Sequence, residues 1–119
     1  MIAGQYFDAS NVIHCFVRDP KGVITTFDAP GAGTGSGQGT FGGFINSPGA
    51  ITGGFTDASG VNHGFVRDPK GGITPFDAPG AGTGAFQGTM PNCINPAGAI
   101  VGQYLDASNA YHGFLLGGE

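Results

Sequence analysis

The sequence predicts an all-β protein built from tandem repeats, and three observations support this class. Residues 2–50 and 51–99 align without a gap and are identical at 32 of 49 positions, and a partial third copy begins at Ile100. The 25 Gly and 8 Pro residues are spread along the whole chain, and both residue types destabilise helix interiors. The regular recurrence of Phe, Ile, Val and Tyr argues against disorder. We therefore expect one repeat domain over 1–119, with units 2–50, 51–99 and a partial unit 100–119.

Each full unit is predicted to contain four short antiparallel strands, as the second copy shows. Its expected strands are 51–56, 61–67, 72–77 and 87–94. The first two should form a hairpin because Asp57-Ala-Ser-Gly60 carries typical turn residues, and Asp68-Pro-Lys-Gly71 should turn the chain into the third strand. Pro75 interrupts that third strand and favours an edge or a bulge. Four strands in 49 residues is the size of one propeller blade.

The number of units predicts association. A closed propeller usually needs about four to eight blades, whereas this chain supplies two full units and part of a third. Repeat units that remain open leave strand edges and apolar faces uncovered. We expect a homo-oligomer or a polymer, in the form of a ring or a filament. The function that follows is self-assembly, structural support or adhesion without enzymatic activity.

Composition excludes several other classes. Only 10% of the residues are charged and the formal net charge is −4. The basic residues occur only in two copies of an Arg-Asp-Pro-Lys-Gly turn, namely Arg18, Lys21, Arg67 and Lys70. Such acid-flanked turns do not form the basic surface that nucleic-acid binding requires. No apolar run approaches the length of a membrane span, and Met1 leads directly into repeat sequence, so no signal peptide is expected in this chain.

The repeat is similar to a known family. The pattern Gly-x-(Tyr/Phe)-x-Asp-Ala-Ser-x-x-x-His-Gly-Phe, followed by Phe-Asp-x-Pro-Gly-Ala, resembles the HAF repeats of bacterial extracellular proteins, and the resemblance covers essentially the whole chain. The His-(Ala/Gly)-Phe core is matched at 63–65 and 112–114, whereas Cys15 replaces the central residue of the first copy. The resemblance implies a secreted or cell-surface β-repeat protein with a propeller-like fold. It implies no catalytic residues.

An Asp, a Ser and a His recur in every unit at the same spacing, which are the residue types of a hydrolase triad. An enzyme needs one site, however, and a set of residues that repeats three times is typical of a structural role. We expect each Asp to bond backbone N–H groups of its turn and each His to bond across the hairpin beside an aromatic ring. Metal binding, with calcium as the possible ion, is a less favoured alternative. Its candidate ligands are Asp8, His14, Asp57, His63, Asp106 and His112.

The aromatic residues supply the second functional hypothesis, a glycan-binding propeller fragment that is completed by oligomerisation. Exposed tyrosines on a weakly charged β surface can stack on sugar rings, and the ligand candidates are Tyr6, Tyr104 and Tyr111. The alternative is that these rings fill space between repeats. We expect core packing for Tyr104 and for its counterpart Phe55, and solvent exposure for Tyr111. Phe16, Phe65 and Phe114 are expected in the core.

The two cysteines do not belong to the repeat pattern. Cys15 stands where the other copies have Gly, and Cys93 stands where the first copy has Phe44. We expect two free thiols, both mostly buried as small apolar residues. A disulfide within or between chains is the alternative.

Overall fold

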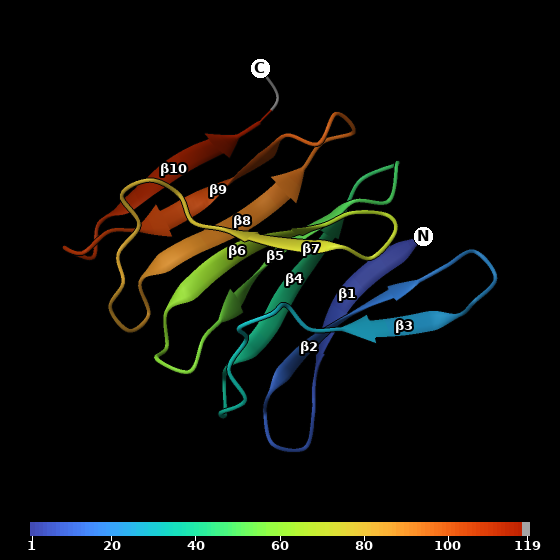
Figure 1. The fold of residues 1–119 in the computed structure, drawn as a ribbon, viewed down its shortest axis with the longest axis horizontal. Helices are drawn as coiled ribbons and strands as arrows, with labels where there is room; N and C mark the ends of the chain where they lie inside the picture. The colour runs from blue at the N-terminus through green and yellow to red at the C-terminus, as the bar shows by residue number, and fades with distance from the viewer. Residues whose placement is uncertain (118–119) are drawn as a thin grey trace.

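A computed structural model describes residues 1–117 and confirms the all-β class: these residues form ten strands and no helix. The strands cross the molecule in chain order, from β1–β3 on one side to β8–β10 on the other (Figure 1). Their bounds are β1 Ile2–Phe7, β2 Ile13–Arg18, β3 Ile24–Phe27, β4 Gly39–Ile45, β5 Ile51–Thr56, β6 Asn62–Arg67, β7 Ile73–Phe76, β8 Gly88–Ile94, β9 Ile100–Leu105 and β10 Tyr111–Leu116.

The predicted hairpins form at all three places. β1 pairs with β2, β5 with β6 and β9 with β10, each antiparallel and without a register shift. β3 and β7 then pair with the free sides of β2 and β6, also antiparallel. Pro75 lies in β7 opposite Phe65, on a strand whose one partner is β6, which agrees with the expectation that proline occupies an edge.

The fourth strand of each unit differs from the prediction, because it does not pair antiparallel with the third. β4 leaves its own unit and pairs antiparallel with β5, and β8 does the same with β9. Within its unit, each meets the second strand through one parallel pair, Ile13 with Gly39 and Asn62 with Gly88. The result is one open mixed sheet, in which β4, β5, β6 and β7 are consecutive antiparallel neighbours across the boundary between units.

Glycine makes this parallel contact possible. Gly39 has a φ of 119°, and a Cβ on it would lie 2.1 Å from the Ile13 carbonyl oxygen. Gly88 has a φ of 116°, and its Cβ would lie 1.9 Å from the Asn62 carbonyl oxygen. Any other residue would have to separate the two strands, since no side-chain atom fits at that distance.

β4 also passes close to β1, at a bulge. The register of β4 on β5 shifts between Gly42 and Phe44, and the bulged residue Gly43 approaches Gly4 so closely that a Cβ would lie 2.9 Å from the Gly4 carbonyl oxygen. The Gly42 N–H donates to the side-chain oxygen of Gln5 at 2.6 Å. β8 bulges at the same place, between Pro91 and Cys93.

The hydrophobic core lies between the first two units. Cys15, Ile51 and Phe65 are fully buried, and the Phe65 ring packs edge-on against Phe27. Burial of Phe65 and Phe55 agrees with the sequence-based expectation, whereas Phe16 and Phe114 are only half-buried. The partial third unit presents less packed surface, so its counterpart of Phe65 remains partly exposed.

The cysteine expectation requires one correction. Both thiols are free, but Cys93 is exposed, contrary to the expectation that it is buried. It lies on the bulged part of β8, where the register shift turns the chain outward. Cys15 lies inside the core, and this burial raises the pKa of its thiol to about 12.

The molecule is flat, with principal extents of 46 × 40 × 18 Å. A slab of this shape has a large surface relative to its core. Within residues 1–117, no helix has the length and hydrophobicity needed to cross a membrane.

Candidate functional site

The repeated Asp organises the turn of each hairpin. One carboxylate oxygen of Asp57 accepts hydrogen bonds from the backbone N–H groups of Ser59 and Val61, at 2.9 and 3.0 Å. Asp8 and Asp106 make the same two bonds in their own turns. The repeated Ser therefore contributes its backbone N–H to this network.

The repeated His connects that turn to the end of the third strand. Nε2 of His63 lies 2.8 Å from the second carboxylate oxygen of Asp57, and Nδ1 lies 2.7 Å from Asp77. The imidazole ring also stacks on Phe55, its cross-strand neighbour, with centroids 5.0 Å apart. An ionised carboxylate only accepts hydrogen bonds, so both contacts are satisfied together when the imidazole is doubly protonated.

The arrangement recurs in the first unit and is reduced in the third. His14 lies 2.9 Å from Asp8 and 2.8 Å from Asp28, and it packs beside Tyr6. His112 contacts Asp106 at 2.7 Å, and the sequence contains no counterpart of Asp28 after it.

The contacts shift the pKa values of the groups. The hydrogen bonds that His14 makes to Asp8, and next to Asp28, raise its pKa. Partial burial opposes protonation of His63, but its bonds to Asp57 and Asp77 together outweigh burial and raise its pKa as well. Burial likewise works against ionisation of Asp57, yet its bonds with His63 and two backbone N–H groups lower its pKa overall.

This geometry does not provide a catalytic triad. In the two complete copies both imidazole nitrogens face carboxylates, and no hydrogen bond joins a repeated Ser hydroxyl to its His within residues 1–117. A general base would need one nitrogen directed at the nucleophile. Among the residues that the structure describes, no group of three or more His, Cys, Asp or Glu side chains is arranged to hold a metal ion. The six metal candidates instead bond one another in pairs.

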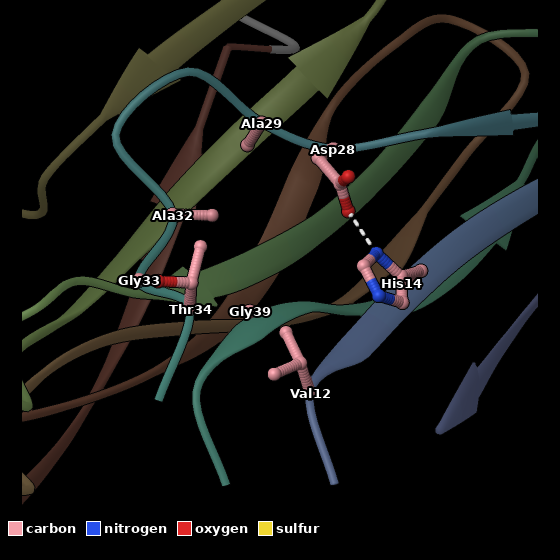
Figure 2. A pocket seen from close by; sticks show the side chains of 8 residues that line it. All are labelled: Val12, His14, Asp28, Ala29, Ala32, Gly33, Thr34 and Gly39. Atoms are coloured by element: carbon pink, nitrogen blue, oxygen red, sulfur yellow. Dashed lines mark hydrogen bonds and ion pairs between the residues drawn. The ribbon is translucent and has the colours of Figure 1, made fainter. Parts of the chain in front are cut away.

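A pocket of about 160 Å³ lies beside the first of these networks (Figure 2). Its walls come from the start of β2, the start of β4 and the loop that follows β3. Asp28 and His14 form one side, and the methyl groups of Ala32 and Val12 face the same space. The full lining is Val12, His14, Asp28, Ala29, Ala32, Gly33, Thr34 and Gly39.

Backbone hydrogen bonds hold the pocket loop in place. The Ala29 N–H donates to the buried hydroxyl of Thr40 at 2.9 Å, and the Gly33 N–H donates to the Thr56 carbonyl of the next unit at 2.8 Å. The side-chain oxygen of Gln38 accepts from the Gly35 N–H, also at 2.9 Å. The same three bonds recur 49 residues later.

The three candidate tyrosines occupy different environments. Tyr6 is 39% exposed and Tyr104 is half-buried, and each packs one ring face against the His opposite it. Tyr111 is 65% exposed, as the sequence analysis expected. None of the three tyrosine rings lines the pocket shown in Figure 2.

Sequence reasoning missed the second carboxylate of each network. Asp28 and Asp77 both follow their His by 14 residues in identical Phe-Asp-Ala-Pro segments, and this constant spacing was the available signal. It also missed Phe86, which is 82% exposed and has a φ of 67° on the loop before β8. Comparison of the chain with protein-family models, curated proteins and solved structures found no match.

Proposed function

We propose that this chain is a non-enzymatic β-repeat module that associates through the edges of its sheet, in a structural or adhesive role. One observation carries the proposal: β4 and β8 pair with the first strand of the following unit. The first strand of a unit therefore receives its outer partner from a neighbouring unit. β1 has the same position in its unit as β5 and β9, and among the described residues its one partner in the sheet order is β2.

The strand order supports a blade-like interpretation of the repeat. β4, β5, β6 and β7 form a four-stranded antiparallel set, and single parallel pairs link successive sets. In this interpretation β1–β3 lack the strand equivalent to β4, and β8–β10 lack the strand equivalent to β7. Three such sets fall below the four to eight blades of a closed propeller, so a closed ring needs further units.

Exposed apolar residues on the two terminal strands support association. On β1, Ile2 is 56% and Phe7 is 58% exposed, and on β10 Tyr111 and Leu115 are 65% and 62% exposed. Sheet edges of monomeric proteins are usually covered or protected by charge. Neither strand carries an Asp, Glu, Lys or Arg residue.

The resemblance to HAF repeats belongs to this proposal, together with the extracellular or cell-surface location that it implies. The network of Asp, His and a stacked ring fits a structural role, because in the two full units its bonds connect the hairpin turn to the end of the third strand. An array of equivalent units requires the same stabilising contacts in each unit.

Sedimentation velocity over a range of protein concentrations tests the proposal. We expect the average mass of the wild-type chain to rise with concentration, and the variant Phe7→Lys to shift the distribution toward monomer because it places a charge on the β1 edge. Val23→Lys is the matched control, since Val23 is 59% exposed but lies outside the terminal strands. A folded wild-type chain that remains monomeric at every concentration would disprove the proposal.

A further inference from the structure

We propose that the pocket between the first hairpin and the loop after β3 binds a small neutral polyol of the size of one sugar ring, and that the second unit contains an equivalent site. This site is separate from the sheet edges that carry the proposed association.

The shape of the pocket limits its ligand. Sites for drug-sized molecules usually measure about 300 to 1,000 Å³, whereas this pocket measures about 160 Å³. It therefore admits one small ring. The loop bonds to Thr40 and Thr56 hold its wall in a fixed conformation before a ligand binds, which reduces the ordering cost of binding.

The chemistry of the lining selects hydroxyl donors. Asp28 uses one carboxylate oxygen for His14, and its side chain is 53% exposed, so the other oxygen can accept hydrogen bonds. Thr34 lies on the opposite wall, and its hydroxyl points toward Gly33 rather than toward Asp28. Hydroxyl groups of a ligand match this acceptor, while the methyl groups of Val12, Ala29 and Ala32 provide an apolar surface for the carbon face of a ring.

Charge argues against ionic ligands. The lining contains no Lys or Arg and includes a carboxylate, which disfavours an anion. A cation would lie beside the imidazole of His14, which already occupies one oxygen of Asp28 and whose protonated form is favoured by its two carboxylate contacts, as its raised pKa reflects. A neutral hydroxyl-rich ligand avoids both conflicts.

The repeat duplicates the lining. Counterparts of all eight lining residues occur 49 positions later with identical residue types. His63 and Asp77 keep the contact of the first copy, at 2.7 Å, and the loop bonds to Thr89 and Leu105 also recur. The loop occurs twice in this sequence, so we expect one site at each copy.

Saturation-transfer NMR on the 119-residue chain tests the inference, and the method tolerates large assemblies. The probes are D-glucose, D-galactose, D-mannose and myo-inositol, with guanidinium chloride and sodium acetate as charged controls. We expect saturable binding of at least one neutral probe, with a dissociation constant on the order of 1 mM because so few atoms make contact.

Pocket-filling variants locate the binding. Ala32→Leu and Ala81→Leu should each reduce the signal by about half, and the double variant should abolish it. Ser36→Leu, on the exposed part of the same loop, should leave binding unchanged. Thr34→Val with Thr83→Val is a second control, and it should leave binding unchanged because the Thr34 hydroxyl points away from Asp28.

Three results would overturn the inference: no saturable binding of any neutral probe, binding of guanidinium or acetate alone, or binding that persists in the double leucine variant while that variant remains folded. Sedimentation of the same variants separates this outcome from the association proposal. Loss of sugar binding with unchanged assembly concerns the pocket, and loss of assembly with retained binding concerns the sheet edges.

Discussion

Replacement of His63 by Gln should destabilise the protein, and the loss should depend on pH. His63 is 24% exposed and contacts two carboxylates, Asp57 and Asp77, at 2.8 and 2.7 Å. It also stacks on Phe55. Glutamine can keep at most one of these two hydrogen bonds, because its amide cannot reach both carboxylates as the imidazole ring does.

The magnitude follows from the exposure of the partners. Asp77 is 58% exposed, so its contact is close to a surface ion pair and contributes up to about 1 kcal/mol. Asp57 is 29% exposed, and its bond contributes on the order of 1 kcal/mol. The expected loss is about 1 to 2 kcal/mol. At roughly 2.1 cal/mol/K of unfolding entropy per residue, that loss lowers the Tm by about 4 to 8 °C.

The pH dependence has a defined sign. The pKa of folded His63 is raised above 6.5, so its contribution to the free energy of unfolding is complete below the unfolded pKa and disappears as pH rises through the folded pKa. The pKa of folded Asp57 is lowered below 3.8, so its contribution is complete above pH 3.8 and is lost on further acidification. The stabilisation by this pair is therefore greatest between about pH 4 and 6.5.

Thermal unfolding at pH 6 and at pH 8.5, at one protein concentration, checks this reasoning. The difference between wild type and His63→Gln should be largest at pH 6 and should shrink at pH 8.5. His112→Gln is the matched control and should cost less, because His112 has one carboxylate partner and is 45% exposed. An equal loss at both pH values, or an equal loss in both variants, would refute the role assigned to the second carboxylate.

Three further predictions concern single positions. Phe86→Gly should raise the free energy of unfolding by about 0.5 to 1 kcal/mol in chemical denaturation, because a positive φ strains every residue except glycine. Phe86 has a φ of 67°, and its counterpart Gly37 has a φ of 79°. A loss of stability would show that the ring makes contacts that offset the strain. Thr40→Val should lower the free energy of unfolding by about 1 to 3 kcal/mol, because the buried N–H of Ala29 loses its acceptor. An unchanged free energy of unfolding in the same assay would contradict that role. A maleimide should label Cys93 but not Cys15 in the native protein, because Cys93 is exposed and Cys15 is buried. Rapid labelling of both cysteines would indicate that the core opens.

The local elements could be predicted because their signals are local. The Asp57-Ala-Ser-Gly60 turn and the Asp68-Pro-Lys-Gly71 turn each fix one connection from four residues, and the first copy has Asp8-Ala-Ser-Asn11 and Asp19-Pro-Lys-Gly22 at the same places. The strands on either side therefore lie within a few residues of their expected bounds. Exposure of Tyr111 was also predictable, since its counterparts Ile13 and Asn62 differ from it in character.

The path of β4 and β8 could not be predicted from such signals. Their pairing with the next unit depends on the close approach of Gly39 to Ile13, a contact between residues 26 positions apart. In the sequence Gly39 is one glycine among 25, and nothing local distinguishes it from the others. The exposure of Cys93 depends on the bulge in β8 and was missed for the same reason.

The position of β4 and β8 links the fold to both proposals. By leaving its unit, β4 creates a sheet that continues from one repeat to the next and in which β1 pairs with β2 at the end of the described strand order. Because β4 does not pair with β3, the loop between these two strands crosses from one hairpin to the next. The Gly33 N–H of this loop donates to the next unit, and the loop lines the same pocket as His14. A mutation that closes the Gly39 contact, such as Gly39→Ala, should therefore disturb edge pairing and pocket geometry together, whereas Phe7→Lys and Ala32→Leu should affect them separately. A chain in which Gly39→Ala impairs only one of the two would show that the strand path does not couple them.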